Sequence, residues 1–221
     1  MIMLFAWLSQ VLYTICFIPQ IITNMRNRSA SGVSDGLLFG YLNLLAGALF
    51  YVFLLDLPLA YKIFVPLQAA AVATLIGQRL WYDDPEEAKQ SGALYVGNIL
   101  LLLAFIPYAS SHPIWVGHVG GWALVLFGFL SQAPQIWKVW QTQSVAGFDR
   151  RFVLVTFWGS FAELAGALLN HLPMQTILSA LRGIVLCTIM LWQFSQYTPQ
   201  QPTTPRGRGE QGPAHPRRAK H

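Results

Sequence analysis

Two oppositely charged side chains, Glu163 and Arg182, lie inside apolar stretches long enough to cross a membrane. Ionisable groups inside a membrane span are costly and usually serve a function or have a partner. From the rise of a helix, Glu163 lies about 10 Å and Arg182 about 14 Å from the same face of the membrane. Because a short hairpin joins their two helices, we expect the side chains to meet. They would form either a structural ion pair or a site for proton transfer or a charged solute.

Uncharged polar and aromatic side chains share these apolar stretches. They are Asn43, Gln68, Asn98 and His118, with Tyr41 and Trp158. The predicted substrate or proton pathway comprises Asn43, Tyr41, Trp158, Glu163 and Arg182. We interpret Asn98 and His118 as structural, and we expect Asp56 and Lys62 to face water at the outer boundary.

No set of residues in the chain is typical of an enzyme, so we expect no catalytic residues and no cofactor. The one acidic cluster, Asp83 to Glu87, has no accompanying His or Cys. We interpret it as a solvated helix-capping loop and not as a metal site, because acidic residues favour helix N-termini. Cys16 and Cys187 each lie in an apolar segment, which favours two buried thiols over a disulfide.

A short motif occurs twice. Pro19-Gln20 lies in an apolar run and is followed by Ser29-x-x-Gly32, while Pro134-Gln135 is followed at the same distance by Ser144-x-x-Gly147. Matching spacing indicates an internal repeat. Proline inside a helix removes a backbone donor, and the freed carbonyl must then face protein or a water-filled path. We therefore interpret Pro19, Gln20, Pro134 and Gln135 as hinges around one pathway, with packing kinks as the alternative.

These residues resemble the PQ-loop family, which includes cystinosin, the lysosomal cationic amino-acid exporters, the SWEET sugar transporters and the KDEL receptors. The match comprises Pro19-Gln20 with Asn24, Arg26, Ser29 and Gly32-Val33-Ser34, and Pro134-Gln135 with Ser144 and Gly147. It covers nearly the whole chain except a linker helix and a tail. The resemblance implies a substrate path between two bundles, with the linker helix outside them.

The chain also departs from the family's pattern. Proton-coupled cystinosin-like members carry an Asp in the second helix of the later repeat, where this chain has Thr156, with Tyr41 as the first-repeat counterpart. Either proton coupling is absent, or Glu163 has taken that role. The second repeat also has Val139 where the first has Asn24.

A second similarity between the repeats has a different spacing. The phrase Leu45-Ala46-Gly47-Ala48-Leu49 recurs as Leu164-Ala165-Gly166-Ala167-Leu168. Its offset differs from that of the Pro-Gln copies by about one helical turn. The alignment of this region is therefore left open.

The composition excludes a soluble domain, because 54% of the residues are hydrophobic and only 10% are charged, against about 25% charged in a typical soluble domain. A membrane helix needs about 20 apolar residues. Seven segments qualify, at residues 3–24, 35–55, 58–81, 92–110, 113–140, 149–170 and 173–196.

The basic residues predict the orientation of these segments, since cytoplasmic loops are enriched in Lys and Arg. With the N-terminus outside, the outer connections keep only Lys62. The inner connections and tail hold Arg26, Arg28, Arg79, Lys89, Lys138, Arg150, Arg151, Arg206, Arg208, Arg217, Arg218 and Lys220. We expect a bacterial inner membrane, with an endolysosomal membrane as the alternative.

The predicted fold is an all-α membrane protein with seven transmembrane helices, in which two parallel three-helix bundles are joined by a linker helix (3+1+3). The predicted domains are a first repeat at 1–82, an acidic loop and linker helix at 83–111, a second repeat at 112–197 and a disordered basic tail at 198–221.

The sequence predicts a transporter of a small polar solute, with an amino acid favoured, that works by alternating access. The expected partners are the lipid bilayer and a small-molecule substrate, without nucleic acid. Proton coupling and a homo-oligomer stay open. The alternatives are a SWEET-like sugar facilitator and a receptor similar to the KDEL receptors.

Overall fold

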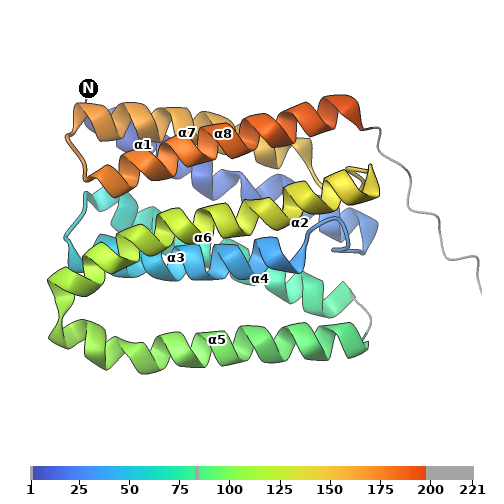
Figure 1. Ribbon diagram of the computed structural model, residues 1–221, viewed down its shortest axis with the longest axis horizontal. Helices are drawn as coiled ribbons and strands as arrows, with labels where there is room; N and C mark the ends of the chain where they lie inside the picture. The colour runs from blue at the N-terminus through green and yellow to red at the C-terminus, as the bar shows by residue number, and fades with distance from the viewer. Residues whose placement is uncertain (1, 83–84, 198–221) are drawn as a thin grey trace, which may run out of the picture.

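The computed structural model describes residues 2–82 and 85–197, and these residues form helices joined by short connections, without a strand (Figure 1). The helices are α1 (Ile2–Ile15), α2 (Phe17–Asn27), α3 (Asp35–Leu54), α4 (Leu59–Tyr82), α5 (Pro85–Ser111), α6 (Pro113–Thr142), α7 (Arg150–Leu169) and α8 (Met174–Gln196). The tail predicted at 198–221 and two residues of the acidic loop, Asp83 and Asp84, lie outside the described residues.

Seven of the described segments are long and apolar enough to cross a membrane, which confirms the seven predicted spans. The first span, Leu4–Asn27, consists of α1 and α2 together. The largest difference from the prediction is at the fourth span, which begins at Ala88 and not at residue 92. Pro85 opens α5 at that end, because the first turn of a helix does not need the N–H that proline lacks.

The two Pro-Gln copies differ in their backbones. The first span is interrupted at Cys16, although that residue keeps right-handed helical angles (φ −58°, ψ −30°). Pro19 cannot donate to the carbonyl four residues before it, that of Ile15, and α1 ends at that residue. Pro134 lies inside the continuous helix α6. The predicted pair of equivalent kinks is therefore an interrupted helix in one repeat and an unbroken one in the other.

The helices pack in two matching sets. Helix α4 packs on α1 and α3, and α8 packs in the same way on α6 and α7. Between the sets, α3 lies along α6 and α1 lies along α7. Helix α5 lies at one edge of the molecule and contacts α4, α3 and α6 (Figure 1). The division into two bundles and a linker helix remains our interpretation of these contacts.

Local backbone features settle how the two sets correspond. Ser34 caps α3 and Asp149 caps α7, each by accepting a backbone N–H with its side chain. Residues with a left-handed backbone conformation follow α2 at Arg28 and α6 at Gln143. Two more follow α3 at Asp56 and α7 at His171. Each pair is separated by the same number of residues as Pro19 and Pro134. The differently spaced Leu-Ala-Gly-Ala-Leu phrases are therefore not structural equivalents.

Small residues allow α3 and α6 to approach closely. A methyl group added to Gly36 would lie 2.7 Å from the Pro134 ring, and one added to Gly47 would lie 2.9 Å from the carbonyl oxygen of Gly120. Small residues serve this purpose in membrane helices, where lipid is as apolar as leucine and close packing drives association. Pro134 is thus a contact between the two sets as well as a residue of α6.

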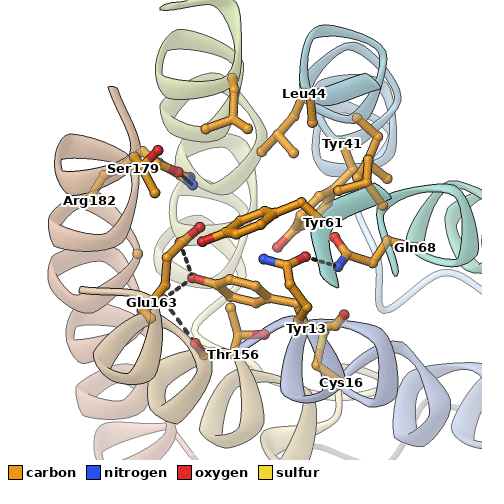
Figure 2. Close-up of a pocket in the computed structure, with 18 of the residues that line it drawn as sticks. Tyr13, Cys16, Tyr41, Leu44, Tyr61, Gln68, Thr156, Glu163, Ser179 and Arg182 are labelled. Carbon is orange, nitrogen blue, oxygen red and sulfur yellow. Dashed lines mark hydrogen bonds between the residues drawn. The ribbon is translucent and has the colours of Figure 1, made fainter. Parts of the chain in front are cut away.

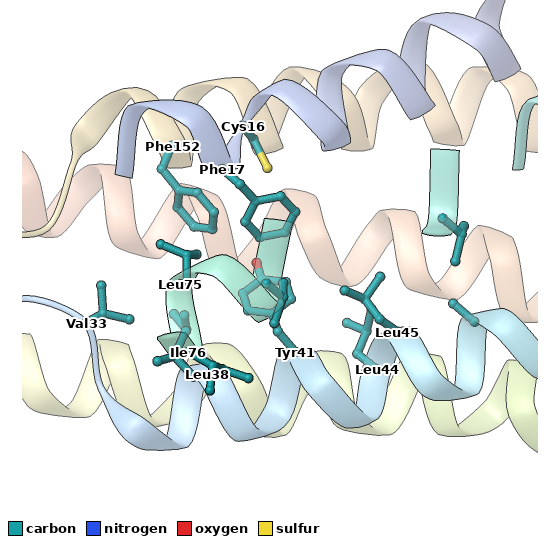
Figure 3. Packing of buried hydrophobic residues seen from close by; sticks show 14 of the residues in the cluster. Cys16, Phe17, Val33, Leu38, Tyr41, Leu44, Leu45, Leu75, Ile76 and Phe152 are labelled. Carbon is teal, nitrogen blue, oxygen red and sulfur yellow. The ribbon is translucent and has the colours of Figure 1, made fainter. Parts of the chain in front are cut away.

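Aromatic side chains form one part of the largely aliphatic buried core, toward the connections that join α2 to α3 and α6 to α7 (Figure 3). The Phe17 ring centroid lies 5.6 Å from that of Tyr41 and 5.7 Å from that of Phe152. All three side chains are buried. Because the rings come from both sets of helices, this cluster, called here the aromatic floor, joins the sets at one end of the molecule.

Candidate functional site

A cavity of about 80 Å³ lies between the two sets of helices (Figure 2). This is several times the space that one buried water needs. Phe17 and Tyr41 of the aromatic floor line it on one side. Its polar lining comprises Gln10, Tyr13, Tyr51, Tyr61, Gln68, Gln132, Thr156, Ser160, Glu163, Thr176, Ser179 and Arg182. Both sets of helices therefore contribute side chains to one polar chamber.

Glu163 is the one carboxylate that lines this cavity among the described residues. It lies on α7 and is buried. The Tyr13 hydroxyl on α1 donates a hydrogen bond to its Oε2 at 2.8 Å, and that hydroxyl also lies 3.0 Å from Ser160 Oγ (Figure 2). The tyrosine reaches across because Gly159 leaves room beside its ring. Glu163 is thus held by the other repeat.

Arg182 enters the cavity from α8. Its guanidinium lies against Gly128 of α6, where any side chain would overlap it. One terminal nitrogen donates to Ser179 Oγ at 3.3 Å, while the buried Nε has no hydrogen-bond partner. An unpaired buried donor costs free energy. The guanidinium is therefore held in place, but its Nε–H has no hydrogen-bond acceptor.

The structure brings Glu163 and Arg182 to the same cavity, as their predicted depths required. The expected ion pair between them is absent. Other charged side chains of the described residues do form ion pairs, among them Asp56 with Lys62, Asp35 with Arg79 and Glu86 with Lys89. Glu163 and Arg182 instead have separate supports, Tyr13 and Ser179. The physical reason is that Tyr13 of α1 holds Glu163, while Ser179 of α8 itself and the contact with Gly128 of α6 hold Arg182.

Tyr41 is a predicted pathway residue that lines the cavity. Its hydroxyl accepts a hydrogen bond of 3.4 Å from Gln132 Nε2 on α6. Gln68 also lines the cavity, and its Nε2 donates to Gln10 Oε1 at 3.0 Å. The Gln68–Gln10 bond joins α4 to α1 within the first repeat, and the Gln132–Tyr41 bond joins α6 to α3 between the repeats.

Two other predicted pathway residues lie elsewhere. The Trp158 side chain is 60% exposed on the outer surface of α7, because five helical positions place it roughly 140° around the helix from Glu163. Asn43 is buried but donates to the carbonyl of Phe39 in its own helix and does not line the cavity. Of the predicted pathway residues, Tyr41, Glu163 and Arg182 line the cavity, whereas Asn43 and Trp158 do not.

Sequence reasoning missed most of the cavity's hydroxyl groups. They follow helical spacing: Thr156, Ser160 and Glu163 share one face of α7, and Thr176, Ser179 and Arg182 share one face of α8. A search for polar residues three or four positions apart within the apolar segments could have found both faces. Tyr13 carried no such signal, because its partner is distant in sequence.

The predicted hinge residues Gln20 and Gln135 hold the two repeats together. Gln20 Oε1 accepts the N–H of Asp149 at 2.8 Å, and its Nε2 donates to the Gly147 carbonyl at 3.0 Å. Gln135 of the second repeat makes the equivalent bonds to the first repeat. Its Oε1 accepts the N–H of Ser34 at 2.9 Å, and its Nε2 donates to the Gly32 carbonyl at 3.1 Å.

We call these four hydrogen bonds the glutamine clasp. Both glutamine side chains are fully buried. Between them Gly32 and Gly147 pack backbone to backbone, so that a Cβ on Gly32 would overlap the Gly147 carbonyl. The clasp and the aromatic floor therefore close the end of the molecule that carries most of the basic connections.

A second pair of glutamines, Gln78 and Gln193, occupies equivalent places in the two repeats and bonds within each repeat. Gln78 Nε2 donates to the Ile21 carbonyl at 3.2 Å, and Gln193 Nε2 donates to the Ile136 carbonyl at 2.9 Å. Gln78 Oε1 also accepts from Asn24 at 3.0 Å. Gln193 Oε1 has no partner, because Val139 stands where the first repeat has Asn24.

At the other end of the molecule the connections are short. Tyr51 and Thr176 join their hydroxyls at 3.0 Å across the repeats. Asp56 pairs with Lys62 outside the spans, and the hydrogen bond from Lys62 holds the pKa of the Asp56 carboxyl below its ordinary value. Their positions fit the predicted watery boundary, since the Asp56 side chain is 89% exposed.

Within the described parts of the chain, no three or more His, Cys, Asp or Glu side chains gather as metal ligands would. The polar groups that line the cavity include hydroxyls, amides, one carboxylate and one guanidinium. This set suits a small polar molecule with charged groups, since each kind of atom on such a molecule finds a complementary partner.

A family model described as PQ loop repeat matches the chain twice, at residues 1–59 and 116–176. The two matches contain Pro19-Gln20 and Pro134-Gln135, with the two loops that form the clasp. No curated protein matches the chain.

Proposed function

The chain belongs to the PQ-loop repeat family, and we propose that it is a membrane transporter that moves a small polar solute by alternating access. An amino acid or a related metabolite is the favoured solute. The observation that carries this proposal is the polar cavity between the repeats, inside a protein with seven apolar helices. Buried polar atoms are hydrogen-bonded in stable proteins, and this cavity keeps several that are not.

The closed end of the cavity supports a gate. The clasp consists of neutral hydrogen bonds, each with a modest net free energy of about 1 kcal/mol. The repeats can therefore separate there without the cost of breaking a buried ion pair. The Tyr51–Thr176 contact joins the repeats toward the opposite end and is formed here together with the clasp, so this contact must break when the opposite end opens.

Pro19 and Pro134 are the proposed hinges. At Pro19 the helix already lacks a backbone hydrogen bond, so bending there breaks nothing further. At Pro134 the ring contacts Gly36 of the other repeat, so movement of α6 is transmitted to α3. The hinges therefore act by different means, one through the backbone and one through packing.

Proton coupling is a second role for the same site. Glu163 is a buried carboxylate hydrogen-bonded to Tyr13, and a carboxylate that changes its protonation between two states links proton movement to solute movement. In that case Glu163→Gln abolishes uptake driven by a pH gradient yet permits exchange. If Glu163 binds solute instead, both activities fall together.

Reconstituted counterflow tests the proposal. Proteoliposomes are loaded with an unlabelled amino acid or sugar, and entry of the labelled compound is measured with and without a pH gradient. We expect counterflow for amino acids. Counterflow of sugars alone would favour a sugar facilitator. Binding without any counterflow would contradict transport and favour a receptor.

A further inference from the structure

The cavity holds one negative and one positive side chain that are kept apart. Glu163 is fixed by the Tyr13 hydroxyl at 2.8 Å. Arg182 is fixed by Ser179 and by its seat against Gly128. Both residues line the same space, and no ion pair joins them. Opposite charges in a low dielectric attract strongly, yet here each side chain is held by its own support and not by the other. The arrangement therefore suits a ligand that carries both signs.

Atoms without partners lie on the same walls. They are the Nε of Arg182, the Oε1 of Gln132 and the hydroxyl of Tyr61. The Tyr61 side chain is 4% exposed and that of Gln132 is 2% exposed, so neither is freely solvated. The three atoms include a charged donor, an acceptor, and a hydroxyl that does both. A ligand that accepts and donates hydrogen bonds would complement all of them.

From this geometry, and resting on the proposed transport function, we propose that the cavity binds a small zwitterionic amino acid. The ligand's carboxylate lies at Arg182 and its ammonium at Glu163. A zwitterion neutralises both protein charges and brings no net charge into the membrane. A ligand with only one charge leaves the other protein charge without a partner, and a neutral sugar leaves both.

The size and remaining walls of the cavity limit the side chain of this ligand. The volume is about 80 Å³. Leu44, Leu124 and Tyr51 supply apolar surface alongside the polar atoms. This volume suits a ligand with a short side chain, so L-alanine is the appropriate probe.

Binding to the purified protein in detergent tests this assignment on the unaltered chain. The probes are L-alanine, propionate, ethylamine and glucose, which carry both charges, the carboxylate alone, the ammonium alone and neither. We expect alanine to bind about tenfold to a hundredfold more tightly than propionate or ethylamine, because each analogue lacks one charge-assisted contact. Equal binding of an analogue, or a preference for glucose, would overturn the assignment.

Two substitutions then locate the charges. Arg182→Gln should abolish the preference for alanine over ethylamine, and Glu163→Gln should abolish the preference for alanine over propionate. Asp56→Asn removes a carboxylate that lies outside the cavity and should preserve both preferences. If Arg182→Gln does not fold, Arg182→Lys keeps the charge and should keep part of the carboxylate preference. Unchanged preferences in the cavity variants would refute the assignment.

Counterflow separates this inference from the proposed function. If alanine binds with the expected charge preferences but no solute moves, the assignment stands and transport is wrong. If a neutral solute moves and alanine does not bind, transport stands and the assignment is wrong.

Discussion

The side-chain amides of Gln20 and Gln135 occupy equivalent places in the two repeats, and each bonds to the connection in the other repeat. Gln20 bonds to Gly147 and Asp149, and Gln135 bonds to Gly32 and Ser34. Each glutamine satisfies a backbone N–H at the start of a helix, where four such groups lack intrahelical partners. The glutamine of the Pro-Gln motif is thus a contact between the repeats as well as a neighbour of a proline.

Removal of one clasp glutamine should open the closed end of the cavity. In Gln20→Ala the N–H of Asp149 and the carbonyl of Gly147 lose their partner, which costs about 1–3 kcal/mol per buried group. Cys16 is buried and lines the cavity, so it reports on opening without an engineered thiol. We expect an impermeant thiol reagent to modify Cys16 faster in Gln20→Ala and in Gln135→Ala than in the parent.

A Cys16→Ala version of each clasp variant is the control for this experiment, because the other described cysteine, Cys187, does not line the cavity. Equal labelling rates in the parent and both glutamine variants would show that the clasp does not control access.

A methyl group between the two loops should have a larger effect. In Gly32→Ala the new Cβ would overlap the backbone of Gly147, which cannot move aside as a flexible side chain could. We expect the closed state to be disfavoured and counterflow to fall at least tenfold, as expected when one state of the cycle is lost. The matched control is Gly77→Ala, because a methyl group there meets nothing within 4 Å. Normal counterflow in Gly32→Ala would contradict a tightly closed end.

The sequence predicted the spans well and the site only in part. Apolar length alone located all seven spans, because lipid demands continuous helices. The repeated Pro-Gln identified the family, but its spacing could not show that each glutamine crosses to the other repeat. Glu163 and Arg182 were predicted because charge is rare in a span. Trp158 lies on the outer surface, because a correspondence between repeats gives the position along a helix and not the environment of the side chain.

The unpaired oxygen of Gln193 predicts a stabilising substitution. In the first repeat Asn24 donates to Gln78 Oε1, and Val139 leaves the equivalent Gln193 Oε1 without a donor. Val139→Asn should supply that donor and contribute about 1 kcal/mol, which corresponds to a rise in Tm of about 2–4 °C for a chain of this size. Val139→Leu, which adds no donor, is the control. A fall in Tm for the asparagine variant alone would show that the second repeat does not accept the first repeat's network.

The orientation in the membrane is tested at the two ends of α5. The distribution of basic residues predicts that Ser111 lies at the outer end of the fourth span and Ser91 near its cytoplasmic end. An impermeant reagent added to intact cells should therefore label Ser111→Cys and leave Ser91→Cys unlabelled until the membrane is permeabilised. The reverse pattern would place the N-terminus inside.

Glu163 and Arg182 give the last prediction, through a double-mutant cycle of thermal stability. A buried ion pair broken on one side costs about 3–5 kcal/mol, and removal of both partners recovers much of that loss. Here the two charges have separate partners and no ion pair joins them. In the absence of ligand, Glu163→Gln and Arg182→Gln should therefore be nearly additive, with a coupling free energy below about 1 kcal/mol.

Tyr13→Phe provides the contrast within this experiment. It removes the donor to Glu163, so its effect and that of Glu163→Gln should not add, because both act on one hydrogen bond. Strong coupling between Glu163 and Arg182, with additivity between Glu163 and Tyr13, would mean that the empty protein forms the ion pair after all. Weak coupling between the charges that grows when alanine is bound would place the ligand between them, because a bound zwitterion links two groups that do not touch.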